Sequence, residues 1–301
     1  MLKSMGAALV AAMLALPVAA QTLRPDQAQF RALYKELVET NTTHSTGNCT
    51  LAAQRMAAHL KTAGFADADL NVFVPPGFPL DGGLIATLHG SDPKAAAIIL
   101  LAHLDVVEAK REDWTRDPFV LIEENGNFYG RGTIDDKSQA AIFTDSMARL
   151  KAKKPPLRTI KLVLTCGEES GARINNIRWL IDNHRDWLNA AFALNEGGGG
   201  TLNAQGKPQT LGFQAGEKVS QNFRIEAINP GGHSSMPRPD NAIYDLSRGL
   251  IGLADHDFPV QFNDTTRGYF GAMAGIVGGD TGKAMTELLA NPQDAAADAL
   301  V

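Results

Sequence analysis

The chain has 301 residues, of which 44% are hydrophobic and 20% charged, a composition typical of globular proteins with a sizeable core. The formal net charge is −5 and no segment is strongly basic, which argues against a nucleic-acid partner. The length predicts one large domain or two modest ones.

Residues 1–20 have the pattern of a secretory signal peptide. Lys3 supplies a positive charge, an apolar run extends from Met5 to Leu16, and small residues up to Ala20 fit a cleavage site before Gln21. The apolar run is too short to span a bilayer comfortably. We therefore expect an exported protein, periplasmic or secreted, without stable membrane insertion after cleavage. An uncleaved anchor is the less favoured alternative.

Helices and apolar strands alternate along residues 25–194. Helices are expected from Pro25 to Val38, Leu51 to Ala63, Lys137 to Leu150 and Ile177 to His184. Strands are expected at Leu70 to Val74, Leu84 to Leu88, Ile98 to Ala102, Phe119 to Ile122, Asn127 to Tyr129, Thr159 to Thr165 and Ala191 to Leu194. Asn125-Gly126 is a strong hairpin signal. The alternation predicts an α/β fold whose sheet is covered by helices on both faces.

The sequence contains two cysteines, Cys49 and Cys166. They could pair in an oxidising compartment. Cys166, however, ends an apolar strand, where a buried free thiol is the simpler interpretation. We therefore expect free cysteines and keep a disulfide as the alternative.

The pattern changes near residue 215. Lys218 to Ile228 alternates between apolar and polar residues and predicts a half-exposed strand. Asp240 is expected to cap a helix that ends near Leu253. We place a domain boundary here, with a catalytic domain at 21–215 and a second domain at 216–301.

Polar residues follow the strand at Ile98 to Ala102. His103 and Asp105 are two residues apart in extended chain and share a face. His103 can bind a metal ion while Asp105 orients its ring, as carboxylates commonly do for metal-bound imidazoles. The pattern is weak by itself, because a lone histidine is more often structural.

Two adjacent aspartates, Asp135 and Asp136, follow the glycine-rich segment Gly130 to Gly132 and precede a helix. Such residues are commonly helix N-caps. Close glycines nevertheless let the backbone approach a site, and one carboxylate can bridge two metal ions. Asp135 is the candidate for that bridge.

Carboxylates end two further strands. Glu168 and Glu169 follow one strand and Glu196 follows another. Adjacent side chains point in different directions, so that one glutamate can bind metal while the other acts as a general base. Solvated glutamates in a turn are the alternative. Because sites in open α/β sheets collect at the carboxyl ends of strands, the recurrence of this arrangement favours a metal-dependent hydrolase.

These motifs together resemble the family-twenty zinc metallopeptidases, the group that includes carboxypeptidase S, aminoacylase, acetylornithine deacetylase and succinyl-diaminopimelate desuccinylase. The resemblance extends from about Leu23 to Met273 and is closest to the carboxypeptidase S-like branch. It is carried by the phrases LLAHLDVV, GRGTIDDK, TCGEESGA, ALNEGG and NPGGHSSMPRPDNAI, which occur in family order and spacing.

The resemblance implies a mixed sheet, a partial α+β lid domain through which two copies pair, and a cis peptide between Asp135 and Asp136. It also implies a role for each of seven residues. They are ligands of a first zinc (His103, Glu196), a ligand of both zincs (Asp135), a ligand of the second zinc (Glu169), a general base (Glu168), a residue that orients the imidazole (Asp105) and a lid residue that stabilises the oxyanion (His233).

The family's chain returns from the lid and supplies a last histidine for the second zinc and a group that binds the substrate carboxylate. Here the sequence stops at Val301, and His256 lacks the expected context for a ligand. The intact family holds two zinc ions per subunit. We expect one zinc here, or an incomplete second position. A fragment of a longer product is the favoured explanation, and a short protein with an impaired site is the alternative.

Three functions follow in order of preference. The first is a zinc exopeptidase that cleaves short peptides near a free C-terminus. The second is an amidase that removes acyl groups from N-acyl amino acids by the same chemistry. The third is a non-catalytic exported binding protein.

Overall fold

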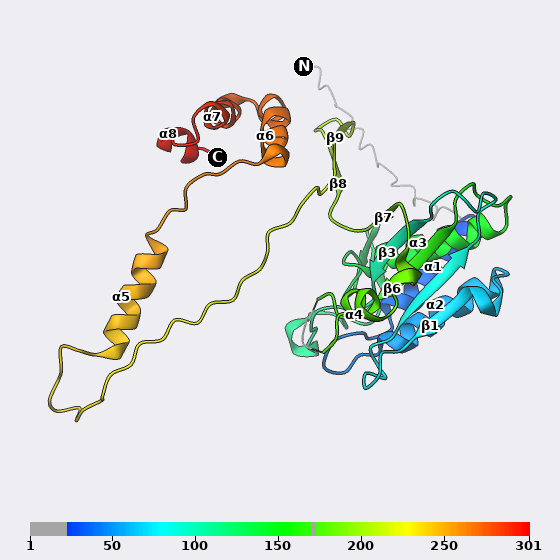
Figure 1. The fold of residues 1–301 in the computed structure, drawn as a ribbon, viewed down its shortest axis with the longest axis horizontal. Helices are drawn as coiled ribbons and strands as arrows, with labels where there is room; N and C mark the ends of the chain where they lie inside the picture. Colours follow the sequence, from blue (N-terminus) through cyan, green and yellow to red (C-terminus); the bar gives the residue numbers. More distant parts are fainter. Residues whose placement is uncertain (1–22, 170–172) are drawn as a thin grey trace, which may run out of the picture. The chain divides into compact units, whose positions relative to one another are not determined.

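The computed structural model of the chain describes residues 23–169 and 173–301 (Figure 1). The expected signal peptide at 1–20 lies outside the described residues. The chain divides into two compact units between Glu196 and Gly197, earlier than the boundary expected near residue 215. Among the described residues, none of the helices has the length and apolar character needed to cross a membrane.

The first unit is built on a five-stranded mixed sheet, as the sequence resemblance implied. Its strand order is β1 (Leu70–Phe73), β2 (Gly83–Leu88), β6 (Ile160–Thr165), β3 (Ile98–His103) and β7 (Phe192–Leu194). Strands β1 and β6 both run antiparallel to β2, whereas β3 runs parallel to β6 and to β7. The carboxyl ends of β3, β6 and β7 therefore meet at one edge of the sheet.

Helices cover both faces of this sheet (Figure 1). One face packs against α1 (Pro25–Val38), α2 (Cys49–Thr62) and α3 (Lys137–Lys151), and the other against α4 (Asn176–Asn183) and the 3₁₀ helix at Arg185–Leu188. Strand β3 contributes Leu100 and Ala102 to the first core and Ile99 to the second. A strand buried on both faces has to be apolar throughout, which explains its continuous hydrophobic run.

A separate hairpin joins β4 (Ile122–Glu124) to β5 (Asn127–Tyr129). Its two turn residues, Asn125 and Gly126, have φ angles of 53° and 77°. Positive φ at both central positions is the geometry that an Asn-Gly pair favours in a two-residue hairpin. Short 3₁₀ helices also occur at Asp67–Asp69 and Arg111–Asp113.

The expectation of free cysteines is wrong, because Cys49 and Cys166 form a disulfide. Both residues are buried, as expected for Cys166. Cys49 is the first residue of α2 and Cys166 directly follows β6, and 117 residues separate them in sequence. Packing of α2 on the sheet brings their Cα atoms to 6.1 Å, a proximity that the separate sequence patterns could not reveal.

The second unit contains the hairpin of β8 (Gly199–Leu202) and β9 (Pro208–Gly212), followed by α5 (Ala242–Ala254), α6 (Asp264–Val277), α7 (Gly279–Ala290) and α8 (Ala295–Asp298). A small core joins Ala284 and Leu288 of α7 to Ala297 of α8. The side chain of Asn241, not the expected Asp240, caps α5 by accepting a hydrogen bond from the backbone N–H of Ile243.

The strand expected at Lys218 to Ile228 is wrong. In the described chain this segment has no strand assignment, and Val219 and Phe223 are 92% and 85% exposed. Alternating apolar residues provide one face of a strand, but a strand also requires a neighbouring chain to accept and donate its backbone hydrogen bonds.

Candidate metal centre

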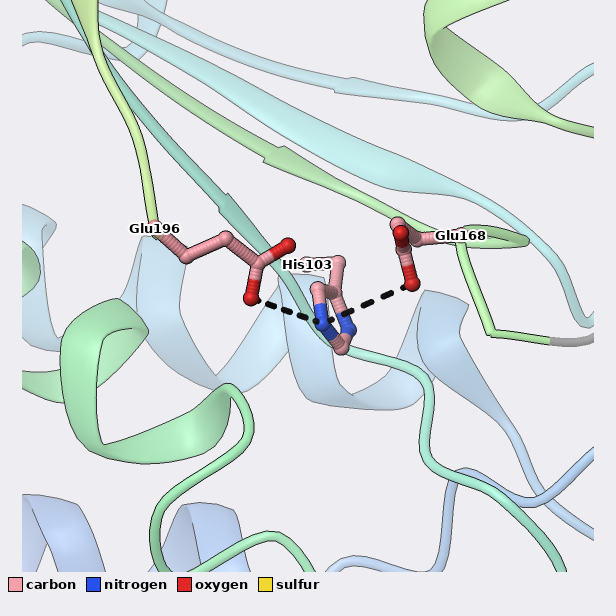
Figure 2. A group of neighbouring side chains, drawn as sticks. All are labelled: His103, Glu168 and Glu196. Carbon is pink, nitrogen blue, oxygen red and sulfur yellow. Dashed lines mark ion pairs between the residues drawn. The ribbon is translucent and has the colours of Figure 1, made fainter. Parts of the chain in front are cut away.

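The shared edge of β3, β6 and β7 brings His103, Glu168 and Glu196 together. His103 ends β3, while the two glutamates lie just beyond β6 and β7. Figure 2 shows the imidazole between the two carboxylates, with its Nε2 atom 3.9 Å from Oε2 of Glu168 and 3.7 Å from Oε2 of Glu196. One ligand atom from each residue lies within 4.8 Å of the others.

A second group shares the same imidazole and adds Asp135 and Glu169. Its ligand atoms also lie within 4.8 Å of one another. Oδ1 of Asp135 is 2.9 Å from Nε2 of His103. The peptide between Asp135 and Asp136 is cis, as the sequence resemblance implied. The structure therefore places the three other expected metal ligands and the expected general base around His103.

The imidazole of His103 is buried and held in one orientation. Its side chain is 3% exposed, and Nδ1 lies 2.9 Å from the backbone oxygen of Asp105. A proton on Nδ1 donated to that carbonyl leaves the Nε2 lone pair directed at the carboxylates, the arrangement that a metal-binding histidine requires. Burial lowers the pKa of His103, but the nearby charges, led by Asp105 and Asp136, outweigh burial and leave it raised.

The carboxylate of Asp105 has its hydrogen-bond partners in the turn after β6. It lies 3.7 Å from Nδ1 of His103, beyond hydrogen-bond distance. Its two oxygens instead accept hydrogen bonds from the backbone N–H groups of Glu168, at 3.3 Å, and Glu169, at 3.0 Å. Asp105 thus contacts the imidazole through its backbone carbonyl. Its side chain holds the turn that carries Glu168 and Glu169.

The two residues after Asp135 are both buried, and the sequence patterns gave neither of them a role in the site. Asp136 accepts a hydrogen bond from the backbone N–H of His103 at 3.2 Å, and burial raises the pKa of Asp136 to about 7. Lys137 is fully buried and donates to the backbone oxygen of Thr40 at 2.7 Å, and burial lowers the pKa of Lys137 to about 7. Their sequence signal was the adjacent charges of GRGTIDDK, which a surface helix cap would also explain.

A cavity of about 220 Å³ opens beside this centre. It is lined by apolar and polar residues at the carboxyl ends of the strands and at the start of α4: Leu101, Ala102, His103, Thr165, Cys166, Glu168, Asn175, Ile177, Asn195 and Glu196. Burial raises the pKa of Glu169, with the charge of Asp135 as the next cause. Crowded carboxylates that repel one another in this way favour a bound cation.

The donor set fits zinc. Zinc accepts imidazole nitrogen and carboxylate oxygen, and its catalytic sites commonly use three protein ligands with one position open. Each of the two groups offers one imidazole and two carboxylates.

His233 belongs to the second unit. It lies in the loop before α5, where its Nδ1 accepts a hydrogen bond from the backbone N–H of Ser235 at 3.2 Å. Its expected contribution to the reaction remains a prediction.

Comparison with known proteins gives a consistent family match. The model of peptidase family M20/M25/M40 matches residues 99–286, more than half of the chain. Human N-fatty-acyl-amino acid synthase/hydrolase PM20D1 is 33% identical over 185 residues, which cover 60% of this chain and 36% of that protein. The "Probable carboxypeptidase S-like 1" of Dictyostelium discoideum is 30% identical over 180 residues, covering 57% and 37%. The chain thus spans just over a third of the length of these relatives.

Similar solved structures include the M20 metallo-carboxypeptidase Sso-CP2 from Sulfolobus solfataricus, with a TM-score of 0.49 and 22% identity over 62% of this chain and 40% of that one. Human carnosine dipeptidase 1 has a TM-score of 0.45 and 23% identity, covering 56% and 38%.

Proposed function

Because the chain belongs to peptidase family M20/M25/M40, we propose that its metal centre hydrolyses amide bonds with zinc as the cofactor. One observation carries the proposal: a buried imidazole, held by a backbone carbonyl, faces four carboxylates at the edge where parallel strands end. Such a cluster costs free energy unless a cation compensates the charges.

Each residue has a distinct part in this proposal. His103 and Glu196 would hold one zinc ion, Asp135 would serve as a ligand for both positions, and Glu169 would begin the second. When bound, zinc supplies a Lewis acid for the amide carbonyl and lowers the pKa of water. Glu168, whose side chain is 53% exposed at the cavity, accepts the proton of the attacking water and returns it to the leaving amine.

Glu168 is the residue whose role most needs a test, because it also belongs to a group of possible ligands. Glu168→Gln removes the base but keeps the size of the side chain. We expect the variant to retain zinc, measured by elemental analysis, and to lose at least about a hundredfold in kcat. Glu112→Gln, at an exposed site in the Arg111–Asp113 helix, is the control. Full turnover in Glu168→Gln would refute the assignment, and loss of zinc would make Glu168 a ligand.

The substrate class has two candidates. We favour short peptides cleaved near a free C-terminus. N-acyl amino acids are the second candidate, supported by similarity to the human N-fatty-acyl-amino acid synthase/hydrolase. Turnover of a dipeptide panel against acetyl- and fatty-acyl amino acids decides between them. A folded chain that binds no zinc would instead support the third function, a binding protein.

We also propose export and pairing of two copies. The signal-like segment at 1–20 supports export, and the disulfide suits an oxidising compartment. Cell fractionation tests the first proposal. Pairing through the second unit rests on the sequence resemblance, and the solution mass tests it.

A further inference from the structure

The disulfide lies directly before the turn that carries two glutamates of the metal centre. Cys166 lines the cavity and is followed by Gly167, Glu168 and Glu169. We infer that the Cys49–Cys166 disulfide positions this turn for metal binding, so that the zinc affinity of the site depends on the redox state of the chain. The inference rests on the proposed metal-dependent function.

Cys49 is a fixed anchor for the disulfide. It begins α2, whose next turns bury Ala52, Ala53 and Met56 completely. The side chain of Asn48 caps the helix by accepting a hydrogen bond from the backbone N–H of Leu51 at 2.8 Å. A cysteine at the start of a packed and capped helix can hold its partner in place.

Hydrogen bonds from the start of α4 and from Asp105 also hold the turn of Gly167, Glu168 and Glu169. Asn176, at the start of α4, donates its backbone N–H to the oxygen of Cys166 at 3.0 Å. Asn175 donates its side-chain amide to the oxygen of Gly167 at 3.2 Å. Asp105, just beyond β3, accepts from the two glutamate N–H groups. These contacts come from β3 and α4, whereas the disulfide restrains the turn from α2.

Loss of the disulfide therefore frees the turn on one side without removing any ligand. Residues that orient metal ligands typically change metal affinity by about 10–100-fold when they are lost. We expect an effect at the lower end, about tenfold, because the hydrogen bonds to Asp105 and α4 remain.

Reduction uses a phosphine, tris(2-carboxyethyl)phosphine, because thiolate reductants themselves bind zinc. Phosphorus gives two electrons to the disulfide and is oxidised to the phosphine oxide. Water supplies the oxygen atom, and its two protons yield the two cysteine thiols.

The experiment measures the zinc Kd by competition with a chromogenic chelator. It compares the oxidised chain, the reduced chain and the Cys49→Ala/Cys166→Ala variant, with circular dichroism to monitor folding. Leu60→Ala, a core change in the last turn of α2, is the matched control for lost stability. We expect about tenfold weaker binding in the reduced chain and in the double variant, recovery on reoxidation, and unchanged binding in Leu60→Ala.

The possible outcomes are distinguishable. Zinc binding by the oxidised chain that does not weaken on reduction overturns this inference but leaves the proposed function intact. Unfolding of both the reduced chain and the double variant, or equal weakening in Leu60→Ala, also overturns it in favour of a purely stabilising disulfide. Failure of the oxidised chain to bind zinc overturns both the inference and the proposed metal centre.

Discussion

The carboxylate of Asp105 accepts a hydrogen bond from the backbone N–H of Glu168 at 3.3 Å. The backbone oxygen of Asp105 lies 2.9 Å from Nδ1 of His103. Asp105, which follows β3, thus fixes the imidazole of His103 and the turn after β6 relative to each other. A metal ion bound between them would depend on this link, although Asp105 is not in either group of possible ligands.

Asp105→Asn should weaken zinc binding by about 10–100-fold. The carboxylate accepts hydrogen bonds from two backbone N–H groups, but an asparagine side chain has only one oxygen. Its amide nitrogen would therefore face the second N–H group, and two donors cannot form a hydrogen bond with each other. Chelator competition measures the Kd. The control is Asp92→Asn, because Asp92 is a half-buried aspartate between β2 and β3 whose side chain also accepts a hydrogen bond from a backbone N–H, that of Lys94. Equal zinc affinity in Asp105→Asn and the original chain would contradict this role.

Gly167→Ala should disrupt the glutamate turn more than a comparable change elsewhere. Gly167 has a φ angle of +88°, and an added Cβ atom would lie 1.7 Å from the backbone oxygen of Ile174. Gly64 has a similar φ of +95° but open space around it. Gly64→Ala should therefore cost only about 1–2 kcal/mol from the backbone conformation. Urea unfolding and zinc Kd of both variants test this, and equal losses would contradict the steric argument.

Most of the candidate site could be predicted from the sequence because three of the four expected ligands, His103, Glu169 and Glu196, follow apolar strands. Parallel strands place their carboxyl ends at one edge of a sheet, which predicts that His103, Glu168 and Glu196 lie close together. The disulfide and the contact between Asp105 and Glu168 could not be predicted from these patterns. They join residues 117 and 63 positions apart, and depend on how α2 packs and on how the turn after β6 folds.

The strand expected at Lys218 to Ile228 shows where a local sequence pattern leads to a wrong prediction. Its apolar residues alternate with polar ones, but strand pairing is a property of two segments, and the pattern of one segment does not supply the second. Lys137 shows a related difficulty, because a lysine at the start of a helix is ordinarily solvated, whereas here the backbone oxygen of Thr40 allows its complete burial.

We expect ionisation of the Tyr34 hydroxyl to lower the stability of the folded chain at high pH. Its hydroxyl donates a hydrogen bond to the backbone oxygen of Thr133 at 2.7 Å, and burial raises the pKa of Tyr34 from 10.0 to about 12. The folded state therefore holds this proton more tightly than the unfolded state. The stabilisation is complete below pH 10 and is lost as the pH rises towards 12.

Tyr34→Phe removes this dependence. Near pH 8 the variant should be about 1 kcal/mol less stable, because it lacks the hydrogen bond. Between pH 10 and 12 the advantage of the original chain should shrink by up to about 1.4 kcal/mol per pH unit and then reverse. Urea unfolding at successive pH values measures the difference, which also cancels the titration of other groups. A difference that stays constant from pH 8 to 12 would contradict the raised pKa.

His233→Ala should lower turnover without changing zinc affinity. In the structure, Nδ1 of His233 accepts the backbone N–H of Ser235, so that a neutral ring carries its proton on Nε2. An Nε2–H group is a suitable donor to an oxyanion, and removing such a donor typically costs about 10²–10³ in kcat. The measurement uses whichever peptide or N-acyl substrate the chain hydrolyses, with His256→Ala as the control because His256 has no assigned role. Full turnover in His233→Ala would remove this residue from the mechanism, whereas a parallel loss of zinc would indicate that it acts on the metal centre and not on the substrate.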